Sequence, residues 1–102
     1  MKARIGQTIT STVDATTVVV VRWPEADLDL RCGGAAMVDA KDAAGPAGSP
    51  DPALCAGTLL GKRYADEALG VEVLCTKAGT GTLTLSGAVL AIKAAKPLPA
   101  SD

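Results

Sequence analysis

The sequence predicts a small all-β protein, a sandwich or flattened barrel of about seven or eight short strands. A β-branched run at residues 16–23 and short apolar–polar alternations next to glycine-containing turns both indicate strands. No window of ten or more residues carries the apolar stripe of a capped helix. The length of 102 residues suits one domain spanning residues 1–102, with a core built mainly from Leu, Val and Ile because Phe is absent.

The first half of the chain opens with its strongest strand signal. The run at residues 16–23 is followed by Pro24, which has no backbone N–H to donate and therefore ends the strand. Residues 28–31 alternate apolar and polar, the glycine pair at 33–34 provides a turn, and residues 36–38 can return as a partner. This order predicts a strand followed by a hairpin.

The second half repeats the alternation of strands and turns. Its expected strands are residues 58–64, 71–76, 82–85 and 89–92, separated by turns at 66–70, 78–81 and 86–87. Residues 39–52 carry three prolines and no large apolar side chain, so we expect a mobile surface loop there. Residues 94–102, which contain Pro97 and Pro99, are expected to form a tail.

An internal repeat organises the chain. An offset of 53 residues places Ser11–Met37 on Tyr64–Leu90 without a gap, with six identities in 27 positions and coincident turns. This pattern predicts two similar half-domains, related by a pseudo-twofold axis, that cover each other's apolar faces. A chance coincidence of two Val-, Leu- and Gly-rich meanders is the alternative.

Segments 64–73 and 79–87 resemble the small β domain of desulforedoxin and the N-terminal domain of desulfoferrodoxin. In the first repeat, Cys32, Gly34 and Met37 fall on the ending of the family motif that completes a four-thiolate iron site. The second repeat has no thiol at the ligand positions, and the first keeps only Cys32. The resemblance therefore implies a shape of two twisted β units and puts the electron-transfer role in doubt.

Composition excludes several classes of function. The chain has no His, which removes His-based acid/base chemistry, Ser-His-Asp and Cys-His nucleophiles, and imidazole metal ligands. A net charge of -1 without a basic run argues against a nucleic-acid partner. Neither a secretory signal nor an apolar run of membrane-spanning length is present, so we expect a cytoplasmic protein with no membrane partner.

Three cysteines are the candidate metal ligands. Cys32, Cys55 and Cys75 could together hold zinc or iron, with a carboxylate such as Asp14 or Asp66, or solvent, as a fourth ligand. The alternative is that they are reduced thiols that pack as small apolar side chains. On that view Cys75 is buried, Cys32 is the most open and reactive because two glycines follow it, and Cys55 is intermediate.

A polar cluster supplies the candidate catalytic residues. Arg63, Tyr64, Asp66 and Glu67 would form an acid/base site if they faced a cavity, with a carboxylate as the base beside the tyrosine hydroxyl. The alternative is the solvated face of a hairpin and its turn.

The sequence favours a small non-catalytic binding or accessory module that serves a partner enzyme, without a cofactor. A core this poor in aromatic residues gains stability by burying surface, so a protein partner or a homodimer is expected. The second hypothesis is a thiolate protein that binds zinc or iron and is similar to desulforedoxin. The third is a small acid/base enzyme that uses carboxylates and Tyr64.

Overall fold

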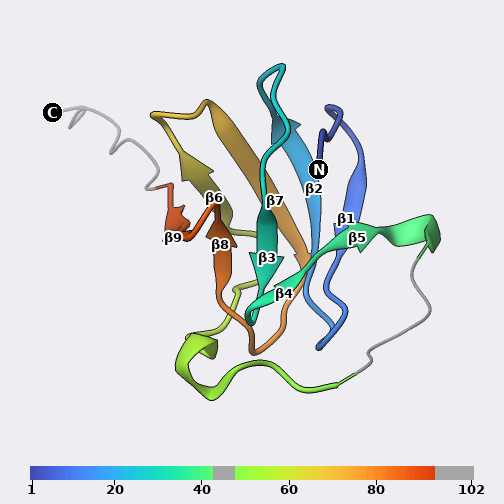
Figure 1. Cartoon of the computed structure of the whole chain (residues 1–102), viewed down its shortest axis with the longest axis vertical. Coiled ribbons are helices and arrows are strands. Elements are labelled where there is room, and N and C mark those ends of the chain that lie inside the picture. Colours follow the sequence, from blue (N-terminus) through green and yellow to red (C-terminus); the bar gives the residue numbers. More distant parts are fainter. Residues whose placement is uncertain (43–47, 94–102) are drawn as a thin grey trace, which may run out of the picture.

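The computed structural model describes residues 1–42 and 48–93, and within these ranges the fold is all-β, as the sequence predicts (Figure 1). The strands form two antiparallel sheets that pack as a sandwich and do not close into a barrel. Two short 3-10 helices, η1 (Ala40–Asp42) and η2 (Pro52–Leu54), are the helical elements of the described ranges. No helix in those ranges has the length and apolar character needed to cross a membrane.

The larger sheet has six strands in the order β10-β6-β7-β2-β1-β5. These strands are β1 (Thr8–Thr10), β2 (Thr17–Arg22), β5 (Val38–Asp39), β6 (Arg63–Asp66), β7 (Val71–Lys77) and β10 (Ala91–Ile92). The smaller sheet has four strands in the order β4-β3-β8-β9. These are β3 (Leu30–Cys32), β4 (Ala35–Ala36), β8 (Leu83–Leu85) and β9 (Ala88–Val89).

The ten strands exceed the seven or eight expected because two extended segments each contribute to both sheets. Residues 35–39 run from β4 into β5, and residues 88–92 run from β9 into β10. Between the strands of each pair lies a buried residue, Met37 or Leu90. Met37 N donates to Leu30 O at 3.1 Å, and Leu90 N donates to Leu83 O at 2.9 Å. Both edges of the sandwich are therefore spanned by a bent strand anchored in the same way.

The 53-residue offset reappears in the strand map. The bounds of β3, β4 and β5 recur 53 residues later as β8, β9 and β10. At the centre of each sheet one half pairs with the other, β2 with β7 and β3 with β8. Val20 lies opposite Val73, and Arg31 lies opposite Thr84, so residues one offset apart face each other. In each sheet, the strands on one side of the central pair repeat in reverse order on the other side: β7, β6 and β10 correspond to β2, β1 and β5, and β8 and β9 correspond to β3 and β4. A pseudo-twofold relation requires this order.

The offset fails at the start of each aligned segment. Ser11 follows β1, whereas Tyr64 lies inside β6. The edge strands attach to equivalent neighbours with a shifted register, because Asp39 of β5 pairs with Ile9, whereas Ile92 of β10 pairs with Tyr64, which lies 55 and not 53 residues after Ile9.

The core lies between the two sheets and follows from the period of two along each strand. The larger sheet contributes Val18, Val20, Val71, Val73 and Cys75, and the smaller contributes Leu30, Cys32, Leu83 and Leu85. Each buried Val or Leu side chain contributes about 1.5–3 kcal/mol relative to its exposed state. The core is therefore shared between the two halves of the chain.

The predicted mobile loop at residues 39–52 is too long, because both of its ends are held to the body. Asp39 belongs to β5, and residues 40–42 form η1. At the other end, Asp51 N donates to Gly33 O at 2.9 Å. Main-chain hydrogen bonds make these attachments, and the hydropathy of the sequence does not reveal such bonds. Residues 43–47 of the loop, and the predicted tail 94–102, lie outside the described residues.

Candidate functional site

The cysteines occupy three different environments. Cys32 and Cys75 are buried, whereas Cys55 is exposed. The prediction that Cys32 is the open thiol is wrong, because Val13 and Pro50 lie against the following Gly33 and cover the turn. The Cys32 Sγ also contacts Asp14 Oδ1 at 3.8 Å.

The structure does not bring the three thiols together as a ligand set. Within residues 1–42 and 48–93, no group of three or more Cys, Asp or Glu side chains is placed to hold a metal ion. Burial raises the pKa of Cys32 and that of Cys75, which favours their neutral thiol form over the thiolate that binds metals.

Thiol labelling tests this arrangement. We expect a disulfide reagent added to the native protein to react rapidly with one thiol, Cys55, and with Cys32 and Cys75 only after unfolding. The number of thiol groups that react in the fast phase and in the slow phase is counted for wild type and for Cys55→Ser. A fast phase that survives in Cys55→Ser would contradict the assigned burial.

The four predicted acid/base residues do not face a common cavity. The buried Tyr64 hydroxyl accepts a hydrogen bond from Leu59 N at 2.9 Å and so holds a neighbouring loop. Asp66 accepts from Leu69 N at 3.1 Å within its own turn. Glu67 is exposed, and Arg63 reaches out to Glu72 at 3.3 Å. In this arrangement each residue stabilises local structure.

Glu72 is a buried carboxylate that the sequence reasoning missed. Its side chain is only 4% exposed and lies between Lys93 Nζ at 2.7 Å and Arg63 Nη1 at 3.3 Å. The hydrogen bond from Lys93 lowers the pKa of Glu72, and the charges of both cations add to this effect against the opposing cost of burial. Strand alternation places Glu72 on the outer face of the sheet, where the two cations come from neighbouring segments. This ion cluster fixes the position of Lys93.

Asp14 joins the two repeats. It follows β1, and its carboxylate accepts hydrogen bonds from Thr16 N at 2.9 Å, Thr16 Oγ1 at 3.0 Å and Gly81 N at 2.6 Å. Gly81 belongs to the turn before β8, so the carboxylate ties the turn of one half to that of the other. The sequence reasoning considered Asp14 only as a metal ligand, and the structure gives it this linking role.

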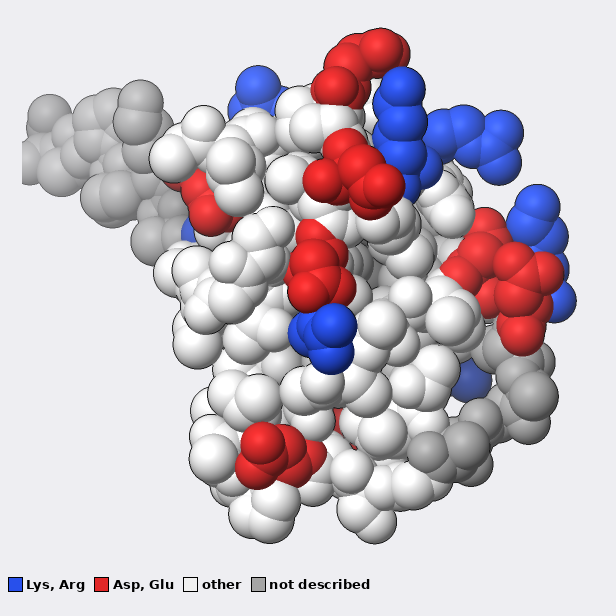
Figure 2. Space-filling model, viewed as in Figure 1, with Lys and Arg blue, Asp and Glu red and all other residues white. Residues whose placement is uncertain are grey.

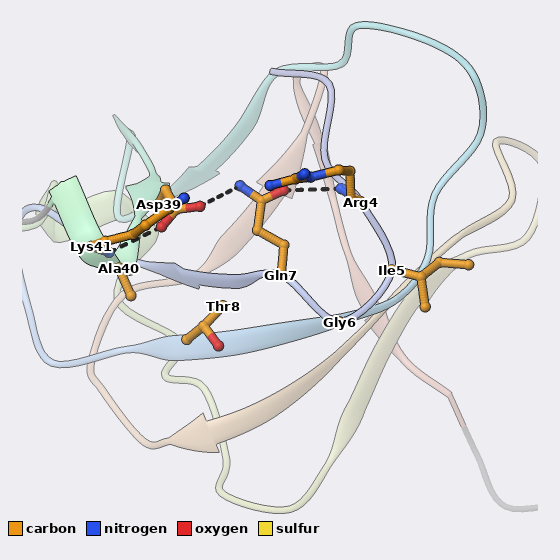
Figure 3. Close-up of a pocket in the computed structure, with 8 residues that line it drawn as sticks. All are labelled: Arg4, Ile5, Gly6, Gln7, Thr8, Asp39, Ala40 and Lys41. Carbon is orange, nitrogen blue, oxygen red and sulfur yellow. Dashed lines mark hydrogen bonds between the residues drawn. The ribbon is translucent and has the colours of Figure 1, made fainter.

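A polar hollow of about 430 Å³ lies beside β1 and β5 (Figure 3). Two of its polar side chains, Gln7 and Asp39, are hydrogen-bonded to each other and to main-chain N–H groups, and the exposed Ile5 also lines it. Asp39 accepts from Gln7 Nε2 at 2.8 Å and from Lys41 N at 3.0 Å, and Gln7 Oε1 accepts from Arg4 N at 2.9 Å. The hydrogen bond from Lys41 N, assisted by Gln7 and by nearby positive charge, lowers the pKa of Asp39. The polar side chains of Gln7 and Asp39 in this hollow are thus already hydrogen-bonded within the chain.

An apolar groove of about 250 Å³ lies beside β9 and β10. Its apolar walls include Leu59, Tyr64, Leu83, Val89, Leu90 and Ile92. Leu59 is 53% exposed, Val89 64% and Ile92 45%, and the adjacent Leu60 is 65% exposed. These four exposed side chains are called the apolar patch below. Large apolar residues gathered at one edge are a feature of interaction sites.

The two edges of the sandwich are equivalent in the repeat but opposite in chemistry. Val89 occupies the place of Ala36, and Ile92 occupies the place of Asp39. Figure 2 shows uncharged surface over β8 and β9, and charged side chains toward the edge that carries β5. At these two positions the β5 edge folds without a large apolar side chain, although the exposed Ile5 lies in the hollow beside it, so the repeat itself does not require Val89 and Ile92 at the β10 edge.

Comparison of the chain with protein-family models, with curated proteins and with solved structures finds no match. The resemblance to desulforedoxin therefore stays a prediction.

Proposed function

We propose that this chain is a small non-catalytic binding module that takes up an extended apolar segment of a protein partner in the groove beside β9 and β10. The observation that carries the proposal is the apolar patch at one edge, where Val89 and Ile92 stand at the positions that Ala36 and Asp39 occupy at the equivalent edge. Exposed apolar surface of this kind gains free energy when a partner removes it from water.

The backbone at this edge suits an extended ligand. Within the described residues, β10 pairs only with β6, and β9 pairs only with β8, so each is the last strand of its sheet. Strands at sheet edges can bind extended segments through main-chain hydrogen bonds, while side-chain pockets select the sequence. The groove supplies such a pocket between the two edge strands.

The hydroxyl groups that line the groove accept hydrogen bonds from the main chain. Tyr64 Oη accepts from Leu59 N at 2.9 Å, and Thr82 Oγ1 accepts from Ala56 N at 2.8 Å. Both hydroxyls thereby hold the chain segment that forms one wall. This supports a binding role over an acid/base role for the groove.

Peptide binding tests the proposal. We expect phage display against the full chain to enrich peptides with alternating large apolar residues. Val89→Asp should weaken their binding about tenfold or more, since a charge in an apolar site forfeits at least about 1.4 kcal/mol. The affinity of one synthetic enriched peptide, measured by calorimetry for wild type and variant, checks this.

The repeat offers a matched control. Ala36→Asp introduces the same charge at the equivalent position of the other edge, which is also exposed, and should leave the affinity unchanged. Equal weakening by both substitutions, or no enriched peptide at all, would contradict the proposed groove. A concentration-dependent dimer that Val89→Asp dissociates would instead identify a second copy as the partner.

A further inference from the structure

We propose that the partner segment is recognised by its own main chain, through hydrogen bonds to the N–H and C=O groups of Val89 and Ile92, and that it bends along the edge between these two residues. This inference rests on the proposed function and assigns the binding atoms of the same site. Three features support it: the direction of these main-chain groups, their spacing, and the contrast with the equivalent edge.

The main-chain groups of Val89 point away from the smaller sheet. In an antiparallel pair, successive residues direct their N–H and C=O alternately toward the neighbouring strand and away from it. Leu90 N donates to Leu83 O at 2.9 Å, so Leu90 is directed toward β8. The preceding residue, Val89, lies opposite Thr84 and is therefore directed outward.

The main-chain groups of Ile92 point away from the larger sheet for the same reason. Lys93 N donates to Arg63 O at 2.7 Å, so Lys93 is directed toward β6. Ile92, opposite Tyr64, is then directed outward. Within residues 1–42 and 48–93, no hydrogen bond engages the N–H or C=O of Val89 or Ile92. The two exposed residues that line the groove thus also carry the outward main-chain groups.

The spacing of these groups sets the shape of the ligand. Along a regular edge strand, outward groups recur at every second residue, but Val89 and Ile92 stand three positions apart. The extra residue arises because Leu90 is directed toward β8 and Ala91, opposite Ala65, toward β6. A segment that bonds to both Val89 and Ile92 must therefore follow the same bend from one sheet to the other.

The equivalent edge is less open to such a ligand. Met37 N donates to Leu30 O at 3.1 Å, so Ala36 is directed outward as Val89 is. The Thr12 hydroxyl, however, donates to Ala36 O at 3.4 Å, so the chain itself already occupies this carbonyl. The β9 and β10 edge is thus the better acceptor of an added strand.

Amide hydrogen exchange on the full chain tests the direction of these groups. In the free protein, we expect the Val89 and Ile92 amides to exchange at least about tenfold faster than those of Leu90 and Lys93, which donate within the sheets. The enriched peptide at saturation should slow Val89 and Ile92 about tenfold or more and leave Ala36 unchanged. Protection of Val89 and Ile92 in the free protein, or no slowing with the peptide, would overturn the inference.

N-methyl groups placed singly along the enriched peptide test the bend, because each removes one N–H donor. We expect two positions, three residues apart, to lose about tenfold or more in affinity, and the two between them to tolerate the methyl group. Sensitive positions two residues apart would indicate a straight strand on one sheet and overturn the bend.

The same peptides separate this inference from the proposed function. Tolerance at every position, with weakening by Val89→Asp retained, would overturn main-chain recognition and leave the groove as a site that binds side chains. If no peptide is enriched at all, the proposed function fails, and this inference fails with it.

Discussion

Replacing Gly79 by alanine is expected to lower the free energy of unfolding by about 3 kcal/mol or more, through overpacking and lost hydrogen bonds. A Cβ atom there would overlap the Thr16 hydroxyl oxygen and lie 2.7 Å from Asp14 Oδ2 and 2.8 Å from Thr16 N. Asp14 Oδ2 accepts the hydrogen bond from Gly81 N that joins the repeats, Thr16 Oγ1 donates to the same carboxylate, and Thr16 N is backbone. The turn before β8 therefore cannot move to make room for the added Cβ without breaking its hydrogen bond to Asp14 in the first half.

Urea unfolding of Gly79→Ala against wild type measures this effect, and Gly61→Ala is the control. Gly61 has a φ of +79°, and a Cβ added to it would meet nothing within 4 Å. Alanine there incurs only the backbone cost of the left-handed conformation, about 1 kcal/mol. Equal losses in the two variants would show that Gly79 is not closely packed against Asp14 and Thr16.

Asp14→Ala is expected to have the second largest effect, a loss of about 3 kcal/mol at neutral pH. The substitution leaves Gly81 N and Thr16 N without their acceptor at a partly buried junction. Unsatisfied buried donors forfeit their solvation, and here two are affected at once. Thermal or urea unfolding at pH 7 checks the magnitude, and a loss below about 1 kcal/mol would show that water replaces the carboxylate.

The same carboxylate makes stability depend on pH. Burial acts to raise the pKa of Asp14, but hydrogen bonds from Gly81 N, from Thr16 N and from the hydroxyls of Ser11 and Thr16 outweigh it and hold that pKa below its usual value. A carboxyl with a lowered pKa stabilises the fold fully above its unfolded pKa of about 3.9. That stabilisation is lost as the pH falls through the lower folded pKa.

Asp14→Asn should therefore remove part of the acid destabilisation of wild type. The two proteins should differ most in free energy of unfolding at pH 7, and the difference should shrink as the pH falls below about 4. Urea titrations of both chains at pH 7, 5 and 3 measure it. A difference that is constant over this range would mean that Asp14 has the same pKa in the folded and unfolded states.

Local pattern was enough to predict most of the strands and the repeat, although it missed β1 and placed at residues 58–64 a strand that lies at Arg63–Asp66. Val18 and Val20 alternate with neighbours on the opposite face, as do Val71 and Val73, and all four are buried. The period of two is a property of a strand's own backbone, so it is readable without knowing what packs against it. The offset of 53 residues likewise needs only the order of strands and turns along the chain.

The candidate site could not be predicted in the same way. Cys32 ends a strand and precedes two glycines, which suggests exposure, but Pro50 covers that turn from 17 positions beyond Gly33. Glu72 stands at an outward position and is nevertheless buried, and it pairs there with Lys93 and Arg63. In both cases burial depends on segments distant in sequence.

The sequence by itself determined an all-β chain, most of its strand positions, its internal repeat and the core-facing residues of the two valine-rich strands. These follow from alternation, β-branched runs and glycine or proline at turns, which act over a few residues. Only the tertiary structure decided that Leu59, Val89 and Ile92 remain exposed at one edge around a groove. Exposure depends on which segments cover an edge once the sheets have packed, and apolar residues there have the same hydropathy as those in the core.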